Sequence, residues 1–176
     1  MSNNNPQIDL FLYQYEYVRQ ATLDGIKHLT KEQLFMPPIE EEWCIGSYLM
    51  HLAECDLAWL QTLSGKEVSA DIKERSYYGV WKDCPAEEGR HPKEPIEVNE
   101  YLETIALTRK MLLDEVASLN DTNLEDLVYR FGQTTGKQYS KKTIINQMID
   151  HEAHTRGQML LLIRKAGYSI INSLNQ

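Results

Sequence analysis

The sequence of 176 residues predicts an all-α fold: a four-helix bundle with a long connection between its second and third helices. Three observations support this prediction. Four segments carry apolar residues every three to four positions, which is the spacing of one helix face. Proline, glycine or asparagine residues follow these segments and stop each helix. The length suits one domain over residues 1–176, and four such helices with one long connection are typical of a bundle.

The first predicted helix runs from about Ile8 to Leu29, and Pro37-Pro38 prevent a helix in the segment that follows it. The apolar face of this helix is formed by Phe11, Tyr15, Val18, Thr22 and Ile26. The second predicted helix runs from about Ile45 to Leu63, and the next residues, Ser64-Gly65, end it in the manner of a C-cap. Its apolar stripe is formed by Leu49, Leu52, Ala53, Leu57 and Leu60.

The connection over residues 66–95 is long and irregular, with prolines and glycines throughout. It also carries Tyr77, Tyr78 and Trp81, which make it too apolar for a disordered linker. Loops of this length tend to be functional or to cover part of the protein. We therefore expect the connection to lie over an end of the bundle, where the three aromatic side chains either cap the core or line a pocket.

The third predicted helix runs from about Ile96 to Leu119 and is broken by residues 120–123. Beyond it, residues 127–131 and 138–139 flank a segment with a glycine at each end, which predicts either a short hairpin or an irregular turn. The fourth predicted helix opens at Ser140, a favourable N-cap. It continues to about Ala166 and is closed by Gly167.

The charge and the cysteine content of the chain exclude several classes of partner. The net charge is −8, whereas binding to a phosphate backbone requires clustered Lys and Arg, so we expect no nucleic-acid partner and no binding to an anionic membrane surface. No apolar run approaches the roughly 18 residues of a membrane span. The three cysteines form no CxxC pair, which suits a reducing compartment, and the N-terminus shows no signal sequence. These features predict a cytoplasmic protein.

Three of the five histidines lie on predicted apolar helices: His51 on the second, and His151 and His154 on the fourth. Histidine is only intermediate in its tendency to be buried, so these positions need an explanation. Side chains of facing helices converge in bundles and build metal sites there, and neutral imidazole binds Zn, Ni, Cu or Fe(II). The simpler explanation for one such histidine is a hydrogen-bonded core residue. The zinc-protease motif H-E-x-x-H is excluded because Thr155 stands at its last position.

Two segments resemble the motifs of a known family. Trp43–Leu52 reads W-C-I-G-S-Y-L-M-H-L and resembles the "W-s-i-g-e-x-x-x-H-l" entry to the second helix of DinB/YfiT-like proteins. His151–Gln158 reads H-E-A-H-T-R-G-Q and resembles the "H-x-x-H-H-R-G-Q" helix of that family. The resemblance covers nearly the whole chain. It implies a four-helix bundle, often dimeric, that holds a divalent metal with three histidines at one end.

Matched position by position to the family, His51 is the first metal ligand and His151 the second. The third family ligand lies four residues after the second, where this chain has Thr155, and His154 matches the preceding histidine of the motif. We therefore take His51, His151 and His154 as the predicted ligands of a Zn, Ni or Mn ion.

Two alternatives to this ligand set remain. In one, two histidines bind the metal and water, Glu54 or Asp56 completes the site. In the other, the site is empty and the histidines are hydrogen-bonded. Cys55 lies one turn after His51, where it is either a thiolate ligand, which would prefer zinc, or a small buried apolar side chain.

The resemblance also implies classes of function. Characterised members include thiol S-transferases that use bacillithiol, mycothiol or glutathione, and a mycothiol-dependent isomerase, although many members have no known activity. We expect a metal-dependent transferase that joins a low-molecular-weight thiol to a small electrophile and forms a homodimer. Arg156 is a candidate for pairing with a carboxylate, or for a structural ion pair with an acidic residue. A non-catalytic bundle with a degenerate metal site is the alternative, and a metal-dependent hydrolase is a third.

Overall fold

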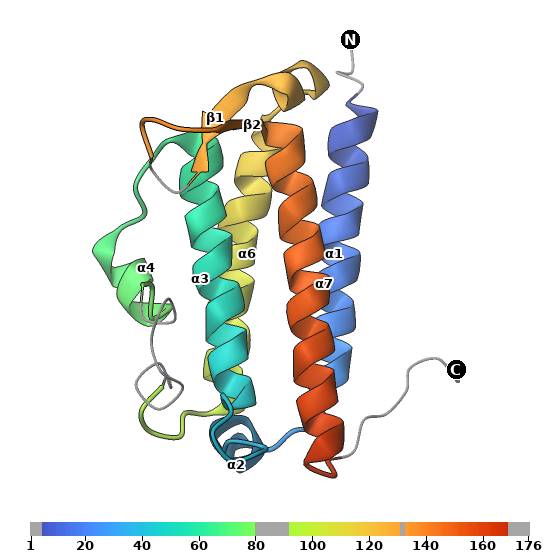
Figure 1. Ribbon diagram of the computed structural model, residues 1–176, viewed down its shortest axis with the longest axis vertical. Helices are drawn as coiled ribbons and strands as arrows, with labels where there is room; N and C mark the ends of the chain where they lie inside the picture. The colour runs from blue at the N-terminus through green and yellow to red at the C-terminus, as the bar shows by residue number, and fades with distance from the viewer. Residues whose placement is uncertain (1–4, 80–91, 131–132, 169–176) are drawn as a thin grey trace.

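The computed structural model describes residues 5–79, 92–130 and 133–168. Within these residues, four long helices form the predicted bundle: α1 (Pro6–Ile26), α3 (Ile45–Ser64), α6 (Val98–Ser118) and α7 (Lys141–Lys165). Helices α1 and α7 run in one direction and α3 and α6 in the other (Figure 1). The prediction of an all-α four-helix bundle is confirmed.

The helix ends follow the local signals in the sequence. Ser140 caps α7, because its side chain accepts a hydrogen bond from the backbone N–H of Thr143. Gly65 ends α3 with a φ of 68°, a left-handed conformation in which a side chain would be strained. The predicted first helix began two residues late and ran three residues past the observed end, since α1 spans Pro6–Ile26.

Short elements connect the long helices. The prediction that Pro37-Pro38 prevent a helix in the segment after α1 was wrong. Helix α2 (Lys31–Phe35) forms there, begins with a capping box between Thr30 and Gln33 and ends before the prolines. The 3-10 helix η1 (Asp121–Glu125) follows α6. Strands β1 (Leu127–Tyr129) and β2 (Gln138–Ser140) then pair in antiparallel register, so the hairpin was the correct alternative.

The long connection takes a different path from the predicted one. Its described part includes α4 (Ala70–Arg75) and lies along the side of α3 rather than over an end of the bundle (Figure 1). The reason is the parallel direction of α3 and α6, because the chain must return the length of the bundle between them. Tyr77 packs on the core from this position and the Tyr78 hydroxyl accepts a hydrogen bond from Gln61, whereas Trp81 lies outside the described residues.

Two apolar clusters fill the interior of the bundle. The first lies at the α2 end and includes Leu49, Ile105 and Ile163. The second lies at the hairpin end and includes Leu112 and Ile144. On each long helix, buried polar side chains lie between the residues of the two clusters. We call these side chains the polar layer: Arg19, Thr22, Asp56, Thr108, Arg109 and Glu152.

The predicted apolar faces agree with the packing. All five residues predicted for the face of the first helix are buried. In α3, Gly46 lies against Tyr101, and a Cβ atom at this position would come within 2.6 Å of the Tyr101 hydroxyl. The glycine of the W-C-I-G segment thus allows α3 and α6 to approach closely. Among the described residues, none of the helices is long and apolar enough to cross a membrane.

Candidate metal centre

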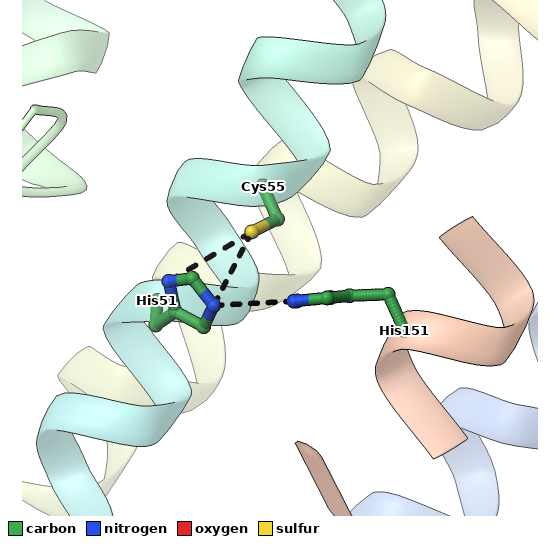
Figure 2. A group of neighbouring side chains, drawn as sticks. All are labelled: His51, Cys55 and His151. Atoms are coloured by element: carbon green, nitrogen blue, oxygen red, sulfur yellow. Dashed lines mark hydrogen bonds between the residues drawn. The ribbon is translucent and has the colours of Figure 1, made fainter. Parts of the chain in front are cut away.

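The structure brings together two of the three predicted ligands. His51 on α3 and His151 on α7 are 100 positions apart in the sequence, yet their Nε2 atoms lie 3.3 Å from each other. The two rings meet edge to face, with centroids 5.1 Å apart (Figure 2). Both side chains are partly buried, and the His51 side chain retains 16% of its exposure. The nitrogen atoms that point at each other are those that imidazole offers to a metal.

Cys55 lies beside these two histidines, and the three residues form one cluster. Its Sγ atom lies 3.5 Å from His51 Nε2 and 3.8 Å from His51 Nδ1, and Figure 2 shows Cys55 and His151 both directed at the His51 ring. The three donor atoms lie within 4.8 Å of one another. His51 and Cys55 share a face of α3 because residues four apart are neighbours on a helix. The structure thus places Cys55 in the cluster.

The distance between the two imidazoles fits a metal. With Zn–N bonds of about 2.0–2.1 Å and tetrahedral geometry, two nitrogen ligands are separated by about 3.3 Å. The observed Nε2–Nε2 distance is 3.3 Å. The separation of the two nitrogens therefore fits two ligands of one divalent ion.

The surroundings of the cluster determine the protonation of its members. Burial, followed by the neighbouring His51 and His154, lowers the pKa of His151 to about 4. The imidazole of His151 is therefore neutral at pH 7, which is the form that binds metals. Burial, followed by the carboxylates of Glu54, Asp56 and Glu152, raises the pKa of Cys55 well above its usual value. Without a metal, the thiol keeps its proton.

Of the two carboxylates proposed to complete the site, only Glu54 approaches it. Glu54 Oε2 lies 3.6 Å from His51 Nδ1, and its other oxygen accepts a hydrogen bond of 2.7 Å from the backbone N–H of Gly79. A carboxylate beside the second nitrogen of a ligating histidine fixes the orientation of the ring. Asp56 instead is held within the polar layer by Arg19 and Arg109.

The remaining motif residues on α7 lie elsewhere. His154 is exposed and lies outside the three-residue cluster. Thr155 occupies the position of the third family ligand and is only 2% exposed. Arg156 donates a hydrogen bond of 3.2 Å to the backbone carbonyl of Val18, so this guanidinium ties α7 to α1.

The polar layer contains an ion-pair network that the sequence analysis missed. Arg19 pairs with Asp56 at 3.1 Å and with Glu152 at 2.8 Å. Arg109 pairs with Asp56 at 2.9 Å and also with Glu152. Thr22 donates to Glu152, and each long helix thereby contributes to one buried network. Burial by itself raises the pKa of Glu152, but the two arginines more than offset it and hold the pKa below its usual value.

Two members of this network are the sequence neighbours of two residues of the cluster. Asp56 follows Cys55 on α3, and Glu152 follows His151 on α7. The network therefore fixes the relative position of the two helices that carry the donor atoms. A signal for it exists in the sequence, because Glu152 falls on the apolar stripe of α7 between Met148 and Thr155.

Comparisons with known proteins agree with the fold and with the motifs. The model of the DinB family matches residues 1–173. The chain belongs to the DinB family. A similar solved structure is that of a DinB-like protein from Bacillus cereus ATCC 10987, with a TM-score of 0.67 and 18% sequence identity over 92% of this chain and 94% of that chain. At this identity, the likeness supports the fold alone. No curated protein matches the sequence.

Proposed function

We propose that this DinB-family protein is a divalent-metal-dependent enzyme that transfers a low-molecular-weight thiol to a small electrophile. The observation that supports this proposal best is the 3.3 Å approach of His51 Nε2 and His151 Nε2 from two different helices. Such an approach of two half-buried imidazoles matches the separation of two ligands on one ion. Zinc, nickel and manganese are the candidate ions.

The protein side chains have distinct roles in this proposal. His51 and His151 hold the ion, and Glu54 beside His51 Nδ1 orients the first ring. A site with three protein ligands leaves an open position for a substrate. When bound, the ion supplies positive charge that keeps a coordinated thiol deprotonated at neutral pH. His154 stays the predicted third ligand from the family motif, and it would have to turn inward from its exposed position to bind.

The other expected partners are part of the same proposal. Tyr77 and Tyr78 lie on the segment next to Glu54, where they would line the electrophile side of the site. We propose a homodimer through α1, on which Tyr13 and Tyr17 stack with ring centroids 6.3 Å apart and are 64% and 67% exposed. Exposed aromatic side chains are enriched at protein interfaces. The unpaired thiols of Cys44 and Cys55 suit the cytoplasm.

A thiol-conjugation assay tests the activity. The zinc-, nickel- or manganese-loaded protein is incubated with bacillithiol, mycothiol or glutathione and with a panel of small electrophiles. Conjugation by the wild type, and its loss in His51→Ala and His151→Ala, is the expected result. Metal-loaded wild type that conjugates none of these thiols above the uncatalysed rate would rule the activity out.

A second function is favoured by one observation. Thr155 is buried at the position of the third family ligand, where a threonine side chain is a poor substitute for imidazole. A non-catalytic bundle with a degenerate site, acting as a small-ligand or stress-response protein, would show this change. It predicts no bound metal and no effect of His51→Ala on function in the cell.

A further inference from the structure

We propose that Cys55 is the third protein ligand of this centre, which makes it a two-histidine, one-cysteine site for zinc or a similarly soft ion. This inference rests on the metal centre of the proposed function and specifies its chemistry. The juxtaposition that supports it is the approach of one donor atom each from Cys55, His51 and His151 to within 4.8 Å of one another (Figure 2).

The distance of the sulfur from His51 Nε2 matches the separation of two ligands on one ion. With a Zn–S bond of about 2.3 Å and a Zn–N bond of about 2.0–2.1 Å, the tetrahedral sulfur–nitrogen separation is about 3.6 Å. Cys55 Sγ is 3.5 Å from His51 Nε2, which is the same nitrogen that faces His151. Sγ is closer to this nitrogen than to Nδ1, at 3.8 Å. Because Sγ also lies within 3.8 Å of Nδ1, the His51 ring would turn on binding so that Nε2 faces an ion shared with Cys55 and His151.

The position of Cys55 explains how the chain tolerates Thr155. In the family pattern, two ligands come from the last helix and one from the second long helix. Here α7 has lost one donor at Thr155, and α3 offers an additional donor one turn after His51. His154, the other possible replacement, is exposed and outside the cluster. The ligand count is conserved while one donor moves from α7 to α3.

A thiolate changes which metals the site prefers. On binding, the thiol proton is released to solvent and the sulfur bonds to the ion, so two neutral imidazoles and one thiolate leave a divalent centre with a net charge of +1. Thiolate ligands favour zinc over hard ions such as manganese. The three ligands leave one position open for a substrate thiol. The same contacts would also suit a metal-free chain of hydrogen bonds from thiol to imidazole, and the experiment must separate these two states.

Cobalt(II) absorption spectroscopy separates them, because Co²⁺ accepts the tetrahedral ligands of zinc and reports a bound thiolate as a charge-transfer band in the near ultraviolet. Full-length, metal-free protein is titrated with CoCl₂ for the wild type, Cys55→Ser and Cys44→Ser. Cys44 is the matched control, since it is a buried cysteine beside α3 whose Sγ contacts Ser47 Oγ at 3.0 Å. The wild type and Cys44→Ser should show the band at one Co²⁺ per chain, and Cys55→Ser should lack it.

Three other outcomes would contradict the role of Cys55 or the proposed function. Stoichiometric Co²⁺ binding by the wild type without a thiolate band would overturn the role of Cys55 but leave the proposed function intact. No Co²⁺ binding by the wild type would overturn both. A band that persists in Cys55→Ser and disappears in Cys44→Ser would show that Cys44 supplies the thiolate, and it would overturn the role of Cys55.

Protection from alkylation gives a second readout that does not depend on activity or on folding of a variant. The wild type is treated with iodoacetamide with and without excess Zn²⁺ or Mn²⁺, and the labelled peptides are quantified by mass spectrometry. Zn²⁺ should slow the labelling of Cys55 at least tenfold, and Mn²⁺ should have little effect. Equal labelling of Cys55 with and without Zn²⁺ would contradict the inference.

Discussion

At the residue level, the lowered pKa of His151 in the candidate metal centre makes the stability of the protein depend on pH. Burial and the neighbouring His51 lower its pKa from 6.5 to about 4 in the folded protein, whereas the unfolded chain has the ordinary value. Between these two values the unfolded chain binds a proton that the folded protein does not. The free energy of unfolding therefore keeps its full contribution from His151 above about pH 6.5 and loses it as the pH falls toward 4.

Urea unfolding of metal-free protein checks this coupling. We expect the wild type to lose more stability between pH 7 and pH 4.5 than His151→Gln, because glutamine does not titrate in this range. Above pH 7, the stability of the two proteins should change with pH in the same way. An identical pH dependence in the two proteins would show that His151 titrates normally in the folded state.

The convergence of His51 and His151 could be predicted from the sequence, but the position of His154 outside the cluster could not. On a helix with 3.6 residues per turn, His154 points about 60° further from the core-facing stripe of α7 than His151 does, which agrees with its exposure. The sequence shows this angle only once the centre of the stripe is known. Glu152 and Thr155 define that centre, and a charged residue was not expected to be buried there.

At the element level, the polar layer joins the four long helices. Apolar stripes set which face of each helix is buried, and all five positions predicted for the buried face of α1 are buried. The partners of Arg19 and Arg109 depend on how the helices rotate about their axes relative to one another. That rotation is set by packing between segments far apart in the sequence, so the network could not be predicted from spacing alone.

Arg109→Met tests the contribution of this layer. The substitution leaves Asp56 and Glu152 buried with Arg19 as their remaining cationic partner. Breaking a buried ion pair by removing one partner costs about 3–5 kcal/mol of stability. Urea unfolding at pH 7 should therefore show a large loss for Arg109→Met.

The neighbouring residue offers a matched control. Lys110 pairs with Asp114 on the exposed side of α6, where solvent screens the pair. Lys110→Met should unfold at nearly the wild-type urea concentration. Comparable losses for the two variants would mean that the polar layer contributes no more than a surface ion pair.

At the level of the whole molecule, the bundle positions the donors by joining distant parts of the chain. The number of long helices and the long second connection follow from the sequence. The path of that connection along α3 depends on the relative directions of α3 and α6, which no local pattern encodes (Figure 1). As a result of this path, Gly79 contacts Glu54 beside His51, so the connection supports the candidate centre from outside the bundle.

The central claim is that His51 and His151 hold one metal ion, and elemental analysis by mass spectrometry tests it most directly. Untagged protein is purified without chelator as the wild type, His51→Ala and His151→Ala, with His28→Ala as a control on an exposed histidine. We expect close to one equivalent of metal per chain in the wild type and in His28→Ala, and almost none in the other two variants. Absence of metal from the wild type, even after incubation with excess Zn²⁺ and Ni²⁺, would contradict it and favour the non-catalytic bundle.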